Sequence, residues 1–332
     1  MTETLMPHEF APKEELLYSD GESTVIVPQK SLVEPKEGVN LTVISEKQLP
    51  PYFSPEAELS DSIHPFLVAL ATAKSVFGNP EERSNQAGNY HLYNQWVNVH
   101  LLPRFGGKDH FQIEIIGRNA RGETWAQPVK YPKFEQFDGR PIVAKEIQNI
   151  REEIFANAEA IREEAEQTVL FDKEFPEGTT VSDKTIFKYK NFEIRMPNEN
   201  PHVEEGGLHL WVHAHTDEKI EGVQDNVKNG IEQFLIAQAI SKLIYSELSI
   251  PIEIHFSGNW GLPTEGHWEE SLSAHANLYG APPGTDRVDL PERPGYKRPE
   301  MPEETRRVIK AAIESNLPQL LAEFEGKHLR EL

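Results

Sequence analysis

The chain of 332 residues contains no cysteine, which excludes disulfide bonds, cysteine-ligated zinc and thiol catalysis. It also lacks any uninterrupted apolar run near the about 18 residues that a membrane span requires, so no membrane partner is expected. The segment from Met1 to Glu15 is polar and acidic, without the apolar core of a signal peptide. These absences predict a cytoplasmic protein.

Positive charge is also scarce. The sequence has 33 Lys and Arg against 54 Asp and Glu, for a net charge of −21. Proteins that bind nucleic acid draw on a surplus of basic residues, so this balance excludes a nucleic-acid partner. It still allows one nucleotide in a local basic pocket.

Two parts of the chain follow the same order of strands and helix. The first has strand patterns at 24–27, 39–45 and 95–102 and a helix pattern at 62–77. The second has a hairpin pattern at 184–196, strands at 207–216 and 251–256, a helix at 223–246 and a strand through His275. This long-period similarity indicates a duplication. The expected organisation is a polar leader (1–22), a first half (23–140), a connecting acidic helix and loop (141–182), a second half (183–285), and a Pro-rich loop with a closing helix (286–332).

The segment with the most candidate catalytic residues lies near the end of the second half. A turn at 257–261 is followed by a strand with Ser273, His275 and Asn277 at alternate positions. Residues two apart on a strand share a face, so the His275 imidazole lies between two short polar side chains. An imidazole held in this way can act as a nucleophile toward phosphorus.

These residues resemble the His-x-His-x-His/Gln signature of the histidine-triad superfamily, most closely the His-Pro-His-x-Gln form of its nucleotidyltransferase branch. Residues 207–213 are similar to the family's Gly-His-Leu-Leu-Val-Ile-Pro strand, and Asn259-Trp-Gly261 to its Asn-x-Gly turn. Residues 95–104 of the first half are similar to His-x-His-x-His-Val-Leu-Pro-Arg. This alignment puts Trp96, Asn98 and His100 at the motif positions. Because an amide cannot form a stable phosphoramidate, the first motif is expected to be degenerate.

Two such domains in one chain resemble the galactose-1-phosphate uridylyltransferase and dinucleoside polyphosphate phosphorylase families. The resemblance implies an α+β fold of two histidine-triad-like halves, each an antiparallel sheet with a long helix. The halves would form a pseudo-dimer, with their sheets packed or joined edge to edge. The chain is expected to be a monomeric pseudo-dimer or a homodimer.

The resemblance also implies an activity. His275 would attack the α-phosphorus of a nucleotide or nucleotide-sugar, oriented by Ser273, and water, phosphate or a sugar phosphate would discharge the nucleotidyl-histidine. Such an enzyme is a nucleotidyltransferase, phosphorylase or hydrolase. The mechanism requires no cofactor and is compatible with a divalent metal ion.

Further residues are candidates for holding the substrate. Asn277, Asn259 and nearby backbone would donate to the phosphate oxygens. Trp268 would stack on a base, and Arg104 would reach a phosphate. The remaining substrate-binding candidates are Gly258, Gly261, His267, His213 and His215.

Two other interpretations stay open. Ser273 stands where the family has its first histidine, which is compatible with a catalytically decayed protein that only binds a nucleotide or sugar-nucleotide. Alternatively, His209, His213 and His215 alternate along one strand face and provide nitrogen ligands for a zinc ion.

Overall fold

Strands and helices are described here from a computed structural model. It describes residues 16–28, 30–31, 38–77, 94–101, 111–119, 137–138, 144–197, 208–215, 226–257, 275–280 and 301–331. The first half contains β1 (Leu16–Ser19), β2 (Ser23–Ile26), β3 (Lys30–Ser31), β4 (Gly38–Ser45), the 3-10 turn η3 (Ser60–Ser62), α1 (Ile63–Phe77), β5 (Asn94–Leu101), β6 (Gln112–Asn119), β7 (Phe137–Asp138) and α3 (Ala144–Gln167). The second contains β8 (Thr185–Tyr189), β9 (Phe192–Arg195), β10 (Leu208–Ala214), α4 (Val227–Leu248), β11 (Ile252–Ser257), β12 (His275–Gly280), α5 (Glu303–Leu321) and η5 (Leu329–Glu331).

Ten strands form one antiparallel sheet in the order β1-β2-β4-β6-β5-β11-β12-β10-β9-β8. The order is mirrored about its centre, because β1, β2, β4, β6 and β5 correspond to β8, β9, β10, β12 and β11. The two five-stranded sheets therefore join edge to edge through β5 and β11, where His100 is the direct backbone partner of His255. The α+β fold of two sheet-and-helix halves is confirmed.

Both halves repeat the same local details at one spacing. A β-bulge lies between Leu16 and Tyr18 in β1, and between Thr185 and Phe187 in β8. The next hairpin turns at a residue with positive φ, Gly21 (88°) in one half and Lys190 (53°) in the other. The members of each pair are 169 positions apart. The same spacing therefore identifies the counterparts of residues in β1, β2 and β4, which lie in β8, β9 and β10.

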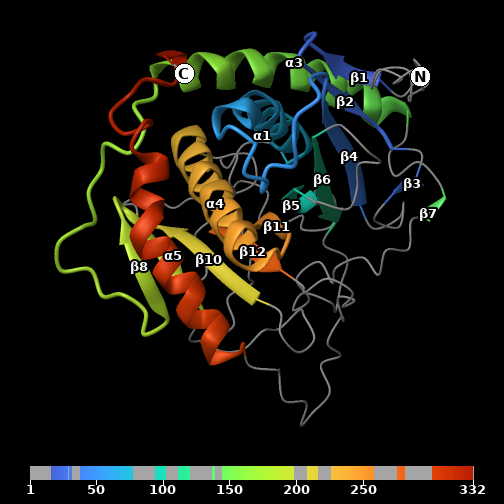
Figure 1. Ribbon diagram of the computed structural model, residues 1–332. Coiled ribbons are helices and arrows are strands. Elements are labelled where there is room, and N and C mark those ends of the chain that lie inside the picture. The colour runs from blue at the N-terminus through green and yellow to red at the C-terminus, as the bar shows by residue number, and fades with distance from the viewer. Residues whose placement is uncertain are drawn as a thin grey trace, which may run out of the picture.

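The helices lie on one side of the sheet (Figure 1). Their packing follows from the period-2 pattern of the strands, in which Leu208, Leu210 and Val212 of β10 turn their side chains to the helices. Phe256 of β11 meets Phe66 of α1 and Phe234 of α4 there, with ring centroids 5.2 Å and 6.4 Å away. The strand side chains are therefore apolar on the face that contacts the helices and mostly polar on the opposite face.

The acidic helix α3 packs on α1 and β1, as α5 packs on α4 and β8. Helix α3 also contacts α4 and η5 of the second half. Strand β1, Leu16–Ser19, lies inside the segment expected to be a polar leader. The first half therefore begins before residue 23.

The face of the second half that points away from the helices is called the polar face here. Its residues occupy alternate positions of β9 to β12: Glu193, Arg195, His209, Trp211, His213, Glu253, His255, His275, Asn277 and Tyr279.

Candidate functional site

His275 opens strand β12 on the polar face. The neighbouring Ala276 and Leu278 are fully buried toward the helices, and this places His275 and Asn277 on the opposite side. The backbone of His275 is paired with His213 of β10 on one side and with Ser257 of β11 on the other. His275 is partly exposed, whereas Asn277 is buried. Of these two motif residues, His275 at the middle position is therefore the more accessible.

Asn277 belongs to a packed cluster further along the face. Its amide oxygen lies 3.2 Å from Nε2 of His209. The indole N–H of Trp211 points to the same nitrogen. The ring of Tyr279 stacks on His209 with 4.6 Å between centroids. His209 is therefore buried and held between Asn277, Trp211 and Tyr279.

His213 is the cross-strand neighbour of His275. Burial, and then the positive charges of Arg195, His215 and His275, lower the pKa of His213 from 6.5 to about 3. It is therefore a neutral imidazole at physiological pH. The same observation means that Arg195 and two further imidazoles lie near His213, together with Glu193, whose negative charge acts in the opposite direction.

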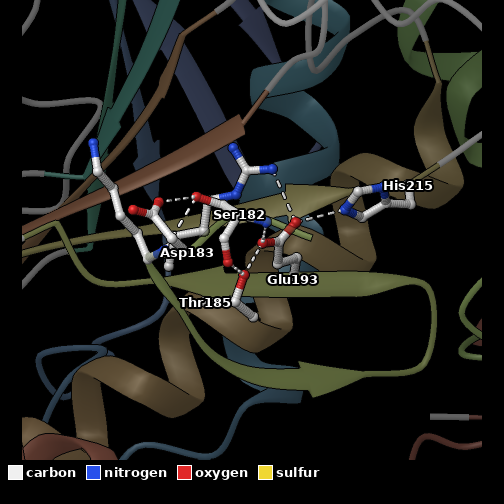
Figure 2. A network of polar contacts seen from close by, with 7 residues as sticks. Ser182, Asp183, Thr185, Glu193 and His215 are labelled. Atoms are coloured by element: carbon white, nitrogen blue, oxygen red, sulfur yellow. Dashed lines mark hydrogen bonds and ion pairs between the residues drawn. The ribbon is translucent and has the colours of Figure 1, made fainter. Parts of the chain in front are cut away.

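Glu193 lies opposite His213 on β9 and is fully buried. Its carboxylate accepts hydrogen bonds from four groups (Figure 2). These are Nε2 of His215 at 2.7 Å, Nη2 of Arg195 at 2.9 Å, the backbone N–H of Ser182 at 3.0 Å and the hydroxyl of Thr185. Burial opposes ionisation of Glu193, but these hydrogen bonds outweigh it and lower its pKa. Glu193 is therefore a buried, ionised carboxylate.

The sequence reasoning did not single out Glu193, Arg195 or Thr185. They lie in the hairpin of β8 and β9, which the sequence predicted without assigning a functional residue to it. One signal was available: Glu193 and Arg195 alternate with Phe192 and Ile194, which are apolar residues of a buried strand. Charged residues at alternate positions of such a strand indicate a polar cluster on its other face.

The motif of the first half lies elsewhere than the alignment predicted. Strand β5, with Trp96, Asn98 and His100, is the counterpart of β11, and β6 is the counterpart of β12. Ile44 and His213 are separated by the repeat spacing, and their backbone partners are Gln112 and His275. Gln112, not Asn98, therefore occupies the position of His275. The consequence is unchanged, because this residue is also an amide.

Several candidate residues lie outside the part of the chain that the structure describes: Arg104, Gly258, Asn259, Gly261, His267, Trp268 and Ser273. Of the predicted residues, the structure brings His213, His215, His275, Asn277 and His209 to one face. The rings of His213 and His215 are 5.0 Å apart between centroids, but His215 is bound to Glu193 and His209 to its own cluster. Within the described ranges, no three His, Cys, Asp or Glu residues are arranged to hold a metal ion.

No protein-family model matches the chain, and no curated protein matches it significantly in sequence. Its fold is similar to three solved structures. A uridylyltransferase mutant has 14% identity and a TM-score of 0.43, over 93% of this chain and 94% of that one. A GalT-like protein from Arabidopsis thaliana has 12% identity and a TM-score of 0.44, over 87% and 83%.

The third is an ADP-glucose phosphorylase from Arabidopsis thaliana with bound ADP-glucose, with 12% identity, a TM-score of 0.42 and coverage of 87% and 82%. No helix in the described segments is long and apolar enough to cross a membrane.

Proposed function

We propose that the protein transfers or releases nucleotidyl groups through a covalent intermediate on His275. The observation that carries this proposal is the placement of His275 at a partly exposed position of the polar face, beside the neutral His213. In its neutral form, an imidazole at a partly exposed position can attack phosphorus.

The charge of the face supports an anionic substrate. Arg195 and the imidazoles of His215 and His275 surround His213 and lower its pKa, whereas Glu193 raises it. Arginine and protonatable imidazoles offer hydrogen-bond donors and positive charge to a phosphate group. A nucleotide or nucleotide-sugar meets this requirement and offers a phosphorus atom to His275.

Only the second half is proposed to react. Its counterpart in the first half has Gln112 at the position of His275, and an amide nitrogen has no basic lone pair. The first half then acts as scaffold, and one chain has one reacting centre.

The test is a search for a covalent adduct. The protein is incubated with nucleoside triphosphates, dinucleoside polyphosphates and nucleotide-sugars. Its intact mass is then measured by mass spectrometry at mildly alkaline pH, where phosphohistidine survives. The expected result is a mass gain of one nucleoside monophosphate. In His275→Ala the adduct is absent and turnover falls about a thousandfold or more, because the nucleophile is gone.

Gln112→Ala is the matched control, since it changes the same position of the other half and is expected to keep the adduct. A protein that forms no adduct and turns nothing over, but melts at a higher temperature with nucleotides, is the decayed binder. An adduct that persists in His275→Ala would place the nucleophile on another residue.

A further inference from the structure

His215 and Glu193 form a pair on the polar face that the proposed attack by His275 does not use. Nε2 of His215 lies 2.7 Å from a Glu193 oxygen. A carboxylate bound to one ring nitrogen orients the imidazole and stabilises its protonated form. The other nitrogen, Nδ1, is then the one that can exchange a proton with a ligand.

Several further contacts hold the His215–Glu193 pair in place. Glu193 is 0% exposed and is fixed by Arg195, Thr185 and the Ser182 backbone as well as by His215. The ring of Phe175 packs against the His215 imidazole at 4.7 Å. The backbone N–H of His215 donates to the carbonyl oxygen of Asn191 at 2.8 Å, which fixes the main chain at this point.

The first half has the same backbone with different side chains. Glu46 donates its N–H to the Glu22 carbonyl oxygen at 2.8 Å, and thus occupies the position of His215, 169 residues earlier. Its carboxylate accepts from the Thr24 hydroxyl, and Thr24 is the counterpart of Glu193. The scaffold therefore does not require an imidazole there. The carboxylate–imidazole pair occurs in the half that contains His275.

The spacing of the two imidazoles fits a phosphoryl group. His275 is the direct cross-strand partner of His213, and His215 is two residues further along the same face. Diagonal neighbours of this kind have Cα atoms roughly 7–8 Å apart. Attack in line with the leaving group needs a nucleophile on one side of phosphorus and a proton donor on the other.

We infer that His215 is the general acid for the leaving group at the His275 site, and that Glu193 is its positioning residue. This rests on the proposed function. A lone pair of a His275 nitrogen forms the N–P bond while the P–O bond to the leaving group breaks. The electrons of that bond stay on the leaving oxygen, which takes the proton from Nδ1 of His215. In the second step the acceptor returns a proton to His215 as it displaces His275 from phosphorus.

Leaving groups of different basicity test the role. One substrate is a nucleoside 5′-(phenyl phosphate), whose phenolate is about as basic as the tyrosine side chain (pKa about 10) and departs more easily with a proton. The other is a nucleoside 5′-(p-nitrophenyl phosphate), whose less basic nitrophenolate departs without one. His215→Asn and Glu193→Gln are expected to slow adduct formation about a hundredfold with the phenyl ester, and less than about tenfold with the nitrophenyl ester.

Glu46→Gln, at the position of His215 in the other half, is the control and is expected to react like the wild type with both substrates. Equal losses with both substrates would mean that Glu193 and His215 only support the fold, and would overturn the inference. Unchanged rates in both variants would overturn it too. A wild-type protein without adduct on either substrate would refute the proposed function itself, which separates the two failures.

Discussion

Three histidines of the polar face have three different surroundings. His213 is partly buried beside Arg195, His215 lies against a buried carboxylate, and His275 is partly exposed at the start of β12. Because the environment of an imidazole decides whether it is neutral, charged or free to react, one face can hold residues with different roles. None of these differences is visible in the residue type.

The protonation of His213 is directly measurable. Its pKa of about 3 lies below the ordinary 6.5, so the folded state holds this proton more weakly than the unfolded state. Stability is therefore lost as the pH falls below 6.5 toward 3. We expect ¹⁵N chemical shifts of a neutral ring for His213 at pH 5, with the resonance assigned from its loss in His213→Gln. A titration midpoint near 6.5 would contradict the burial described here.

At the scale of elements, the repeated hairpin decides which strands correspond. The bulge, the positive-φ turn and the backbone hydrogen bond recur at one spacing in β1–β2 and β8–β9. Sequence similarity alone pointed to β5 as the motif strand of the first half, since Pro103-Arg104 match a family ending. Strand pairing depends on contacts between residues far apart in the chain. The topology therefore decides that β6, and not β5, is the counterpart of β12.

Helix α4 contains a carboxylate that responds to pH. Burial raises the pKa of Glu232 to about 7, although its oxygen accepts from the Phe171 N–H and Lys228 is nearby. The folded state therefore holds this proton more tightly than the unfolded state, and the contribution of Glu232 to stability declines as the pH rises from 4.5 to about 7.

In urea unfolding at pH 5 and pH 8, Glu232→Gln is expected to be less sensitive to this rise than the wild type, by up to about 1.4 kcal/mol per pH unit between the two pKa values. Glutamine keeps an acceptor for Phe171 and carries no charge. Glu314→Gln, on the half-exposed side of α5, is the control. An identical pH dependence of the Glu232 variant and the wild type would show that this carboxylate is not the buried acid.

At the scale of the molecule, the two halves share one core as well as one sheet. Phe66 of α1 stacks on Phe234 of α4 with 4.2 Å between centroids and 7° between planes. Both rings are fully buried and lie over Phe256. Contacts of this kind across the pseudo-dimer couple the folding of one half to that of the other.

Phe66→Ala is expected to lower the free energy of unfolding by about 3–5 kcal/mol, because it leaves a cavity between the halves. Unfolding in urea, followed by tryptophan fluorescence and by circular dichroism, is expected to remain a single transition. Phe155→Ala, which removes a ring that is 52% exposed, should cost about 1 kcal/mol or less. Two separate transitions would contradict the shared core.

Most elements could be predicted from the sequence, because their signals are local. Alternation of apolar residues located β10 and β12, and helical spacing located α1 and α4 to within a few residues. The candidate site was only partly predictable. His213, His215 and His275 were found by their pattern, whereas Glu193 was missed, since its importance comes from His215, which is 22 residues away in sequence and beside it in space.

By itself, the sequence determined the repeated order of strands and helices and the face on which each strand residue lies, while the α+β class was implied by its family resemblance. The order and the faces depend on periods of two and 3.6 residues and need no knowledge of distant partners. The tertiary structure decided that β5 meets β11 at the centre of one sheet, that Gln112 corresponds to His275, and that Glu193 holds His215. Register and cross-strand neighbours are set by packing between segments far apart in the chain, and no local pattern specifies them.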